Sequence, residues 1–158
     1  MLEWNDPLRR ALLFWGARVV ECRTKDQMSW PRSAKSVVLI VEDEPMVRLF
    51  AVEMVQKAGF EVIEAANADD AIRILETHSD IRVVFTDIHM PGSMDGLKLA
   101  HAVRNRWPPI KIIVTSAQRM ATGNELPEGG RFLAKPYSSA QIRGVLRESG
   151  GAGGSVRF

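Results

Sequence analysis

Three polar motifs in this chain follow apolar runs, and each contains a side chain suited to phosphoryl or metal chemistry. Asp87 follows Val83-Val84-Phe85-Thr86, the acidic triplet Glu42-Asp43-Glu44 follows the run 37–41, and Lys135 follows Phe132-Leu133-Ala134. A short apolar run bounded by polar residues is typical of a buried strand. We therefore expect each of these side chains where a strand ends, so that acids from two strands and a lysine from a third can meet in one crevice.

Carboxylates gathered in this way favour chemistry that involves a hard cation. Two or three of them at close quarters repel one another unless protons or a cation offset their charge. One or two carboxylates, with water and phosphate oxygens, are the ligands that Mg²⁺ prefers. With such an ion bound, the Asp87 carboxylate can attack phosphorus, because carboxylates form aspartyl phosphates. Lys135 can supply positive charge to the phosphoryl oxygens, and the hydroxyl of Thr115 can turn toward the same oxygens.

Five strands are predicted by apolar runs that alternate with segments of helical periodicity. The runs are 37–41, 61–65, 82–86, 110–115 and 131–134. This alternation is the signature of βα units around a parallel sheet, and predicts a flavodoxin-like, doubly wound α/β fold. In such a sheet, with strand order 2-1-3-4-5, ligands bind beyond the carboxyl ends of the strands where the order reverses. The first and third strands flank that reversal, so we expect Asp43 and Asp87 to face each other across the crevice.

Helices are predicted between the strands from residue spacing and end signals. After the first strand, Pro45 suits a first helical turn. Apolar residues then recur at helical spacing, at Met46, Leu49, Phe50, Met54 and Val55. The segment 117–130 contains a proline and a pair of glycines, which leave room for little more than two helical turns. The fourth helix is therefore expected to be short or irregular.

Composition and charge narrow the classes of protein that fit. A chain of 158 residues with 46% apolar content is typical of one domain. Its net charge of +2, with both signs mixed along the chain, gives no electrostatic case for direct binding of nucleic acid. The apolar stretch 11–17 is too short to span a membrane. Cys22 is the only cysteine, which suits a reducing cytosol, and we expect a cytoplasmic protein.

The predicted domain covers residues 36–149 and leaves a segment at each end. Residues 1–35 form an N-terminal extension, for which two interpretations remain open. It is either an amphipathic segment, with Leu8, Leu12, Trp15 and Val19 on one face, or a disordered leader. Residues 150–158 are rich in glycine and are expected to form a flexible tail.

Residues 36–149 resemble a response-regulator receiver domain of bacterial two-component signalling, of the stand-alone type. The matching positions are Glu42 and Asp43, Asp87 within Thr86-Asp87-Ile88-His89-Met90-Pro91, Asp95-Gly96, Thr115-Ser116-Ala117 and Lys135-Pro136-Tyr137. The resemblance implies that Asp87 is the phosphoacceptor and that Thr115 and Lys135 bind the phosphoryl group. It implies that Mg²⁺ is held by Glu42, Asp43, Asp87 and the backbone carbonyl of His89. It also implies a conformational switch formed by Thr115 and Phe132.

The same resemblance implies the kinds of partner. The phosphoryl group would come from a histidine kinase or a histidine phosphotransfer protein. Output would pass through protein–protein contacts, and homodimer formation is left open. Such a protein is not an enzyme toward a separate substrate, because it catalyses only its own phosphoryl transfer and autodephosphorylation. Two positions depart from the usual pattern: Ser93 lengthens the loop 91–96 by one residue, and Phe132 lacks the hydroxyl of a tyrosine switch.

Two other functions are consistent with parts of the sequence. The first is a receiver-like interaction module that binds partners without phosphorylation. The altered loops keep this alternative open, although the intact Asp43, Asp87, Thr115 and Lys135 argue against it. The second is a phosphatase with an aspartate nucleophile on a related α/β sheet. That nucleophile normally ends the first strand in an Asp-x-Asp pattern, which Glu42-Asp43-Glu44-Pro45 does not match.

Overall fold

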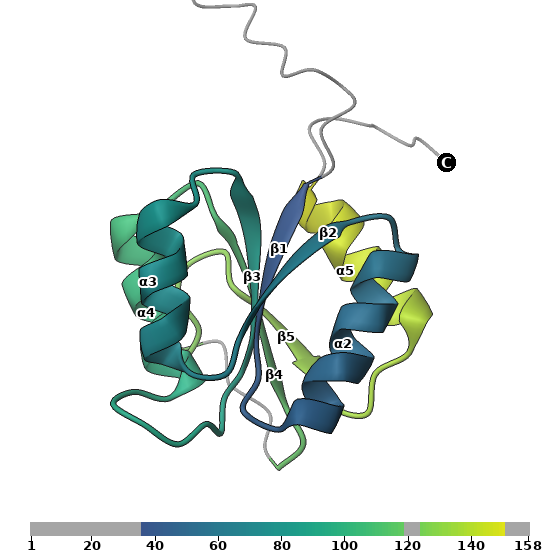
Figure 1. The fold of residues 1–158 in the computed structure, drawn as a ribbon, viewed down its shortest axis with the longest axis horizontal. Helices are drawn as coiled ribbons and strands as arrows, with labels where there is room; N and C mark the ends of the chain where they lie inside the picture. Colours follow the sequence, from purple (N-terminus) through teal and green to yellow (C-terminus); the bar gives the residue numbers. More distant parts are fainter. Residues whose placement is uncertain (1–35, 119–123, 151–158) are drawn as a thin grey trace, which may run out of the picture. The chain divides into compact units, whose positions relative to one another are not determined.

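The computed structural model describes residues 36–118 and 124–150, in which a parallel sheet has helices on both faces (Figure 1). The strands are β1 (Val37–Val41), β2 (Glu61–Ala65), β3 (Ile81–Asp87), β4 (Lys111–Ser116) and β5 (Arg131–Ala134). The helices are α2 (Pro45–Lys57), α3 (Ala68–Thr77), α4 (Gly96–Arg106) and α5 (Ser139–Gly150). The strand order is β2-β1-β3-β4-β5 and every pair is parallel, which confirms the predicted doubly wound fold.

The structure tests the predictions for the two ends of the chain and for the fourth helix only in part. The predicted extension 1–35 and residues 151–158 of the predicted tail are outside the described residues. Between β4 and β5, residues 117–118 and 124–130 contain no helix, in agreement with a fourth helix that is short or irregular. None of the described helices is long and apolar enough to cross a membrane.

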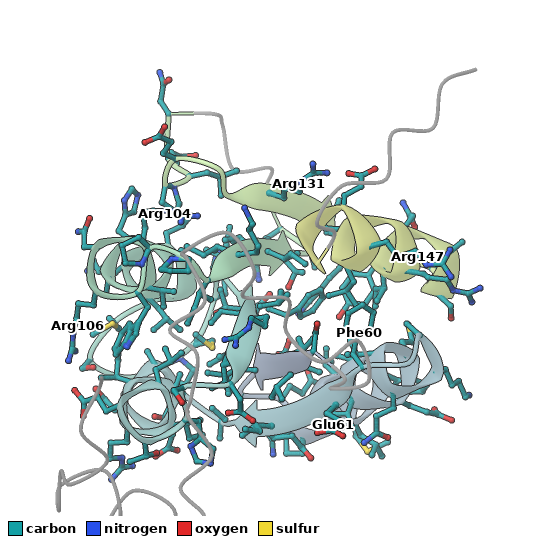
Figure 2. The ribbon with its side chains drawn as sticks, turned by 90° about the horizontal axis from the view of Figure 1, so that it is seen from above. Phe60, Glu61, Arg104, Arg106, Arg131 and Arg147 are labelled. Carbon is teal, nitrogen blue, oxygen red and sulfur yellow. The ribbon has the colours of Figure 1, made fainter. Side chains whose placement is uncertain are left out.

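The core consists of two apolar layers, one on each face of the sheet. Successive strand residues point to opposite faces, so Leu39 and Val41 of β1 pack on the side of α3 and α4, whereas Val38 and Ile40 pack on the side of α2 and α5. Seen from above in Figure 2, the side chains fill the space between the sheet and the two helix pairs. Because both faces are covered, the central strands appear in the sequence as continuous apolar runs.

Most of the large apolar residues of α2 do not lie on the side of the helix that is buried. Their spacing is typical of the buried face of a helix, and Val55 is indeed fully buried. However, Ala51 and Val52 complete the buried face, while Met46, Leu49 and Phe50 are 61%, 59% and 56% exposed. Apolar residues therefore lie on two sides of α2, and spacing alone cannot tell which side packs on the sheet.

Candidate functional site

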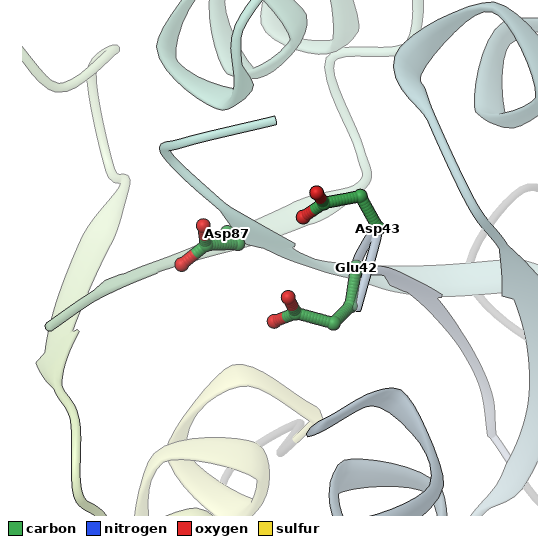
Figure 3. A group of neighbouring side chains, drawn as sticks. All are labelled: Glu42, Asp43 and Asp87. Atoms are coloured by element: carbon green, nitrogen blue, oxygen red, sulfur yellow. The ribbon is translucent and has the colours of Figure 1, made fainter. Parts of the chain in front are cut away.

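The carboxyl ends of β1 and β3 bring three acidic side chains together. The two strands are hydrogen-bonded neighbours, and Val41 of β1 pairs with Thr86 of β3. Glu42 and Asp43 follow Val41, and Asp87 follows Thr86, so these three acidic residues lie side by side (Figure 3). Carboxylate oxygens of all three lie within 4.8 Å of one another. The structure thus brings together the acids that the sequence places at two strand ends.

Lys135, which follows β5, completes this cluster of charges. Its Nζ lies 2.6 Å from Oε2 of Glu42 and 2.9 Å from Oδ1 of Asp87. The Lys135 side chain is 16% exposed, that of Glu42 is 7% exposed and that of Asp87 is 8% exposed. The backbone amide of Lys135 donates to the carbonyl of Ser116 at 2.9 Å. The ammonium group therefore bridges two largely buried carboxylates that come from different strands.

The Asp87 carboxylate is also held from its own loop. Its Oδ2 accepts a hydrogen bond from the backbone amide of His89 at 2.9 Å. Thr115 is the register partner of Asp87 across β3 and β4 and is fully buried. The hydroxyl of Thr115 donates to the backbone carbonyl of Thr86 at 3.4 Å, a long hydrogen bond. Thr115 thus lies next to Asp87 with a hydroxyl that is weakly held.

Burial and charge pairing act in opposite directions on the two central charges. Burial raises the pKa of the Glu42 carboxyl above its ordinary 4.5, although the hydrogen bond from Lys135 opposes this shift. For Lys135, burial lowers the pKa, but hydrogen bonds to Asp87 and Glu42 outweigh that effect and raise it above 10.5. The lysine therefore stays charged at neutral pH, and Glu42 accepts a proton more readily than an ordinary glutamate.

Two contacts around this cluster, one of Arg48 and one of the His89 side chain, were not predicted from the sequence. Arg48 of α2 donates from Nη1 to the backbone carbonyl of Glu42 at 2.6 Å, and its Nε lies 3.3 Å from Oε2 of Glu64. It therefore fixes the segment between β1 and α2. In the sequence, only its position one helical turn after the acidic triplet could have indicated a contact with that triplet. Nδ1 of His89 lies 3.3 Å from the hydroxyl of Ser116, which links the loops after β3 and β4.

Two aromatic residues flank the site on opposite faces of the sheet. Phe132 is half-buried and packs against the apolar layer under α3 and α4. Tyr137 packs edge-on against Phe85 in the other layer, with ring centroids 5.6 Å apart. Burial raises the pKa of Tyr137 to about 12. The phenol is therefore neutral under ordinary conditions.

The acidic cluster fits a divalent metal ion in charge and in ligand type. Glu42, Asp43 and Asp87 offer oxygen atoms, which hard cations such as Mg²⁺ prefer. Three carboxylates face one ammonium group, and a divalent cation would offset the excess of negative charge. Within residues 36–118 and 124–150, no other group of three acidic, histidine or cysteine side chains meets in this way.

Comparison with known proteins agrees with this geometry. The profile of the response regulator receiver domain matches residues 38–147. The chain is 36% identical over 120 residues to the sensor kinase CckA of Brucella abortus, and 31% identical over 108 residues to the transcriptional regulatory protein PdtaR of Mycobacterium tuberculosis. These alignments cover 73% and 66% of this chain, but only 13% and 52% of the two relatives.

A solved structure shows the same likeness in three dimensions. The response regulator protein TrrA of Thermotoga maritima superimposes with a TM-score of 0.67 at 25% identity, covering 73% of this chain and 99% of TrrA. The aligned part therefore corresponds to a whole receiver domain, whereas the curated relatives contain more than this chain spans. From its sequence profile, its strand order and its relatives, the chain belongs to the response regulator receiver domain family.

Proposed function

We propose that this protein accepts a phosphoryl group on Asp87 from a phosphohistidine of a histidine kinase or a histidine phosphotransfer protein. The observation that carries the proposal is the position of the Asp87 carboxylate. Its Oδ1 lies 2.9 Å from Nζ of Lys135, and its Oδ2 lies 2.9 Å from the backbone nitrogen of His89. Glu42 and Asp43 lie beside it. In the reaction, an Asp87 oxygen bonds to phosphorus as the phosphorus–nitrogen bond breaks, and the bonding electron pair stays on the donor imidazole.

The metal ion for this reaction is proposed to be Mg²⁺. Glu42, Asp43, Asp87 and the backbone carbonyl of His89 would hold it. When bound, it reduces the repulsion between the attacking carboxylate and the phosphoryl oxygens. The relative TrrA has been solved in complex with Mg²⁺ and BeF, which supports a site of this kind. Lys135 now contacts both Glu42 and Asp87, and we propose that its ammonium group binds the phosphoryl oxygens during transfer.

The response to phosphorylation is proposed to pass through Thr115 and Phe132. A phosphoryl group adds about −1.5 to −2 charge, which attracts the Thr115 hydroxyl away from its long hydrogen bond to Thr86. That movement frees space into which the half-buried Phe132 turns, and the surface above β4 and β5 changes. Output is through protein–protein contacts in the cytoplasm, without direct contact to nucleic acid. The domain of residues 36–149 catalyses only its own phosphoryl transfer and autodephosphorylation.

Labelling by a small phosphodonor tests this function without a partner protein. We expect acetyl phosphate to phosphorylate the full chain when Mg²⁺ is present, and a chelator to abolish the reaction because the carboxylates then repel the incoming phosphoryl group. Incorporation is measured by intact-protein mass spectrometry. If the chain stays unlabelled with Mg²⁺ present, by acetyl phosphate and by histidine kinases alike, the interaction module without phosphorylation is the better assignment.

The raised pKa of Glu42 predicts the pH dependence of metal binding. Protons compete with Mg²⁺ for this carboxylate. Burial raises the pKa of Glu42 above 4.5. As the pH is lowered, the affinity for Mg²⁺ should therefore begin to fall before pH 4.5 is reached. Titration calorimetry with Mg²⁺ between about pH 7 and pH 4 measures this fall. In Glu42→Gln, affinity should be lower by about tenfold, equivalent to 1.4 kcal/mol, and this part of the pH dependence should vanish.

A matched variant distinguishes this effect from a general change in surface charge. Glu44 lies in the same acidic triplet but is exposed at the start of α2. Glu44→Gln should therefore retain both the Mg²⁺ affinity and its pH dependence. Equal pH dependence in Glu42→Gln and wild type would show that Glu42 does not compete with the metal for protons.

A further inference from the structure

The outer edge of the sheet at β2 is open, and we infer that it binds an extended segment of another protein in which two apolar residues separate two basic ones. The segment adds a strand to the sheet through backbone hydrogen bonds. β2 is an end strand in the order β2-β1-β3-β4-β5, and among residues 36–118 and 124–150 it pairs only with β1. Glu61 begins this outer strand in Figure 2. The inference uses no residue of the acidic cluster and does not depend on phosphorylation of Asp87.

The backbone of β2 offers hydrogen-bonding groups to such a strand. The amide of Glu61 donates to the carbonyl of Ser36 at 3.2 Å, and the carbonyl of Ala65 accepts from the amide of the residue after β1 at 3.1 Å. Both groups therefore point toward β1. Alternate residues of a strand direct their N–H and C=O groups to the same side, so those of Val62 and Glu64 point away from β1. The register of β2 on β1 is continuous, and the edge is regular enough to template another strand.

A groove beside this edge receives side chains of the added strand. The groove has a volume of about 410 Å³ and is lined by the end of β2 and by Arg73, Ile74 and Thr77 of α3. Ile74 is only half-buried, as are Val62 and Ile63 of β2. An added strand directs every second side chain toward α3, so its apolar residues cover this partly exposed apolar surface. Removing that surface from water favours binding.

The charges of β2 select a basic partner. Glu61 and Glu64 are both exposed, and Glu61 forms no ion pair with another residue of the described ranges. Glu64 lies 3.3 Å from Arg48 but its side chain is still 52% exposed. Opposite charges that face each other across two strands stabilise the pairing. Because Val62 and Ile63 lie between the two acids, the complementary strand has two basic residues separated by two apolar ones, in whichever direction it runs.

A second copy of this chain fits the edge less well than a basic segment does. Two β2 strands related by a two-fold axis pair in antiparallel orientation. If the axis passes anywhere from residue 61 to residue 64, Glu61 or Glu64 lies opposite or diagonal to its own counterpart in the other copy. Like charges in these positions destabilise a strand pair, and acids on an edge strand oppose self-association. The same two carboxylates therefore disfavour a homodimer and favour a basic partner.

Titration with a synthetic peptide, followed by NMR, tests the inference. The probe is the capped peptide Thr-Lys-Ile-Val-Lys-Thr, added to the ¹⁵N-labelled full chain. We expect the amide resonances of Val62 and Glu64 to shift more than those of Glu61 and Ile63, because only the first two amides point to the open edge. The Kd should be about 0.1–1 mM, as befits a short peptide. A matched peptide with glutamate in place of both lysines should bind about tenfold more weakly.

Two variants of β2 separate the roles of the backbone and of the charges. Val62→Pro removes an N–H that points outward, a position where an edge strand tolerates proline, and should weaken binding of the lysine peptide by more than about tenfold. Val62→Thr keeps the N–H and the β-branched shape, and should bind within about threefold of wild type. Glu61→Lys/Glu64→Lys leaves the backbone intact and should bind the glutamate peptide more tightly than the lysine peptide.

Three results would overturn the inference. The first is no binding of the lysine peptide to wild type up to about 5 mM. The second is binding that neither Val62→Pro nor the charge-reversed variant changes, since the peptide would then lie elsewhere on the molecule. The third is a wild-type dimer in sedimentation equilibrium that becomes monomeric in Val62→Pro, which would assign the edge to a second copy of the chain. None of these results bears on phosphorylation of Asp87.

Discussion

Asp87→Asn is expected to abolish phosphorylation, with labelling by acetyl phosphate and Mg²⁺ lowered by more than about a thousandfold. The substitution keeps the size of the side chain and its contact with the His89 amide. It replaces the nucleophilic carboxylate by an amide, whose nitrogen and oxygen do not attack phosphorus, and it removes one of three acidic groups from the cluster. Intact-protein mass spectrometry after a timed incubation measures the loss.

The variant must be shown to have lost chemistry rather than structure. Asp80→Asn is a suitable control, because Asp80 is exposed just before β3 begins, at the far end of the same strand. We expect this control to be labelled like wild type, and both variants to unfold at a urea concentration close to that of wild type. Labelling of Asp87→Asn at the wild-type rate would show that the phosphoryl group goes to another residue.

Gly96→Ala is expected to disrupt the site from a position that has no reactive group. A Cβ at Gly96 would lie 1.8 Å from the backbone oxygen of Asp87 and 2.7 Å from its carbonyl carbon, so the β3 end or the start of α4 must move. We expect a loss of about 1–3 kcal/mol in the free energy of unfolding, as overpacking typically costs. Labelling at Asp87 should fall as well, because the displaced backbone carries the nucleophile. Urea unfolding and acetyl phosphate labelling measure the two effects.

Gly144→Ala provides a matched control for glycine replacement in a helix. No atom lies within 4 Å of a Cβ built at Gly144, apart from the helix's own backbone and its chain neighbours. Alanine there should stabilise α5 by about 0.5–1 kcal/mol through its higher helix propensity. The two substitutions should therefore have opposite signs. A Gly96→Ala variant that is as stable as wild type and fully labelled would show that α4 and β3 separate at little cost.

The strands and the meeting of the charged residues were predictable because both depend on local patterns. Continuous apolar runs identify strands that are buried on both faces, and the observed bounds of β3 and β4 differ from the predicted ones by a single residue at each end. Polar residues that end parallel strands must lie at one edge of the sheet. The convergence of Glu42, Asp43, Asp87 and Lys135 followed from that rule and is seen in the structure.

The contacts of long side chains, and the orientation of α2, were not predictable. Arg48 reaches back to a carbonyl six residues earlier and across to β2, a geometry that no sequence spacing specifies. Leu49 and Phe50 have the spacing of core residues but are exposed, because smaller residues on the other side of α2 pack on the sheet. Such departures from the local pattern are expected at functional surfaces.

Direct mapping of the modified residue tests the central claim most closely. The full chain is incubated with acetyl phosphate and Mg²⁺, the acyl phosphate is reduced with borohydride to the stable alcohol, and the digested peptides are sequenced by tandem mass spectrometry. We predict that the reduced residue is at position 87 and that a chelator added beforehand prevents its formation. Reduction at a different acidic residue, or equal reduction at position 87 in chelated and Mg²⁺-treated samples, would contradict the assignment of a metal-dependent phosphoacceptor.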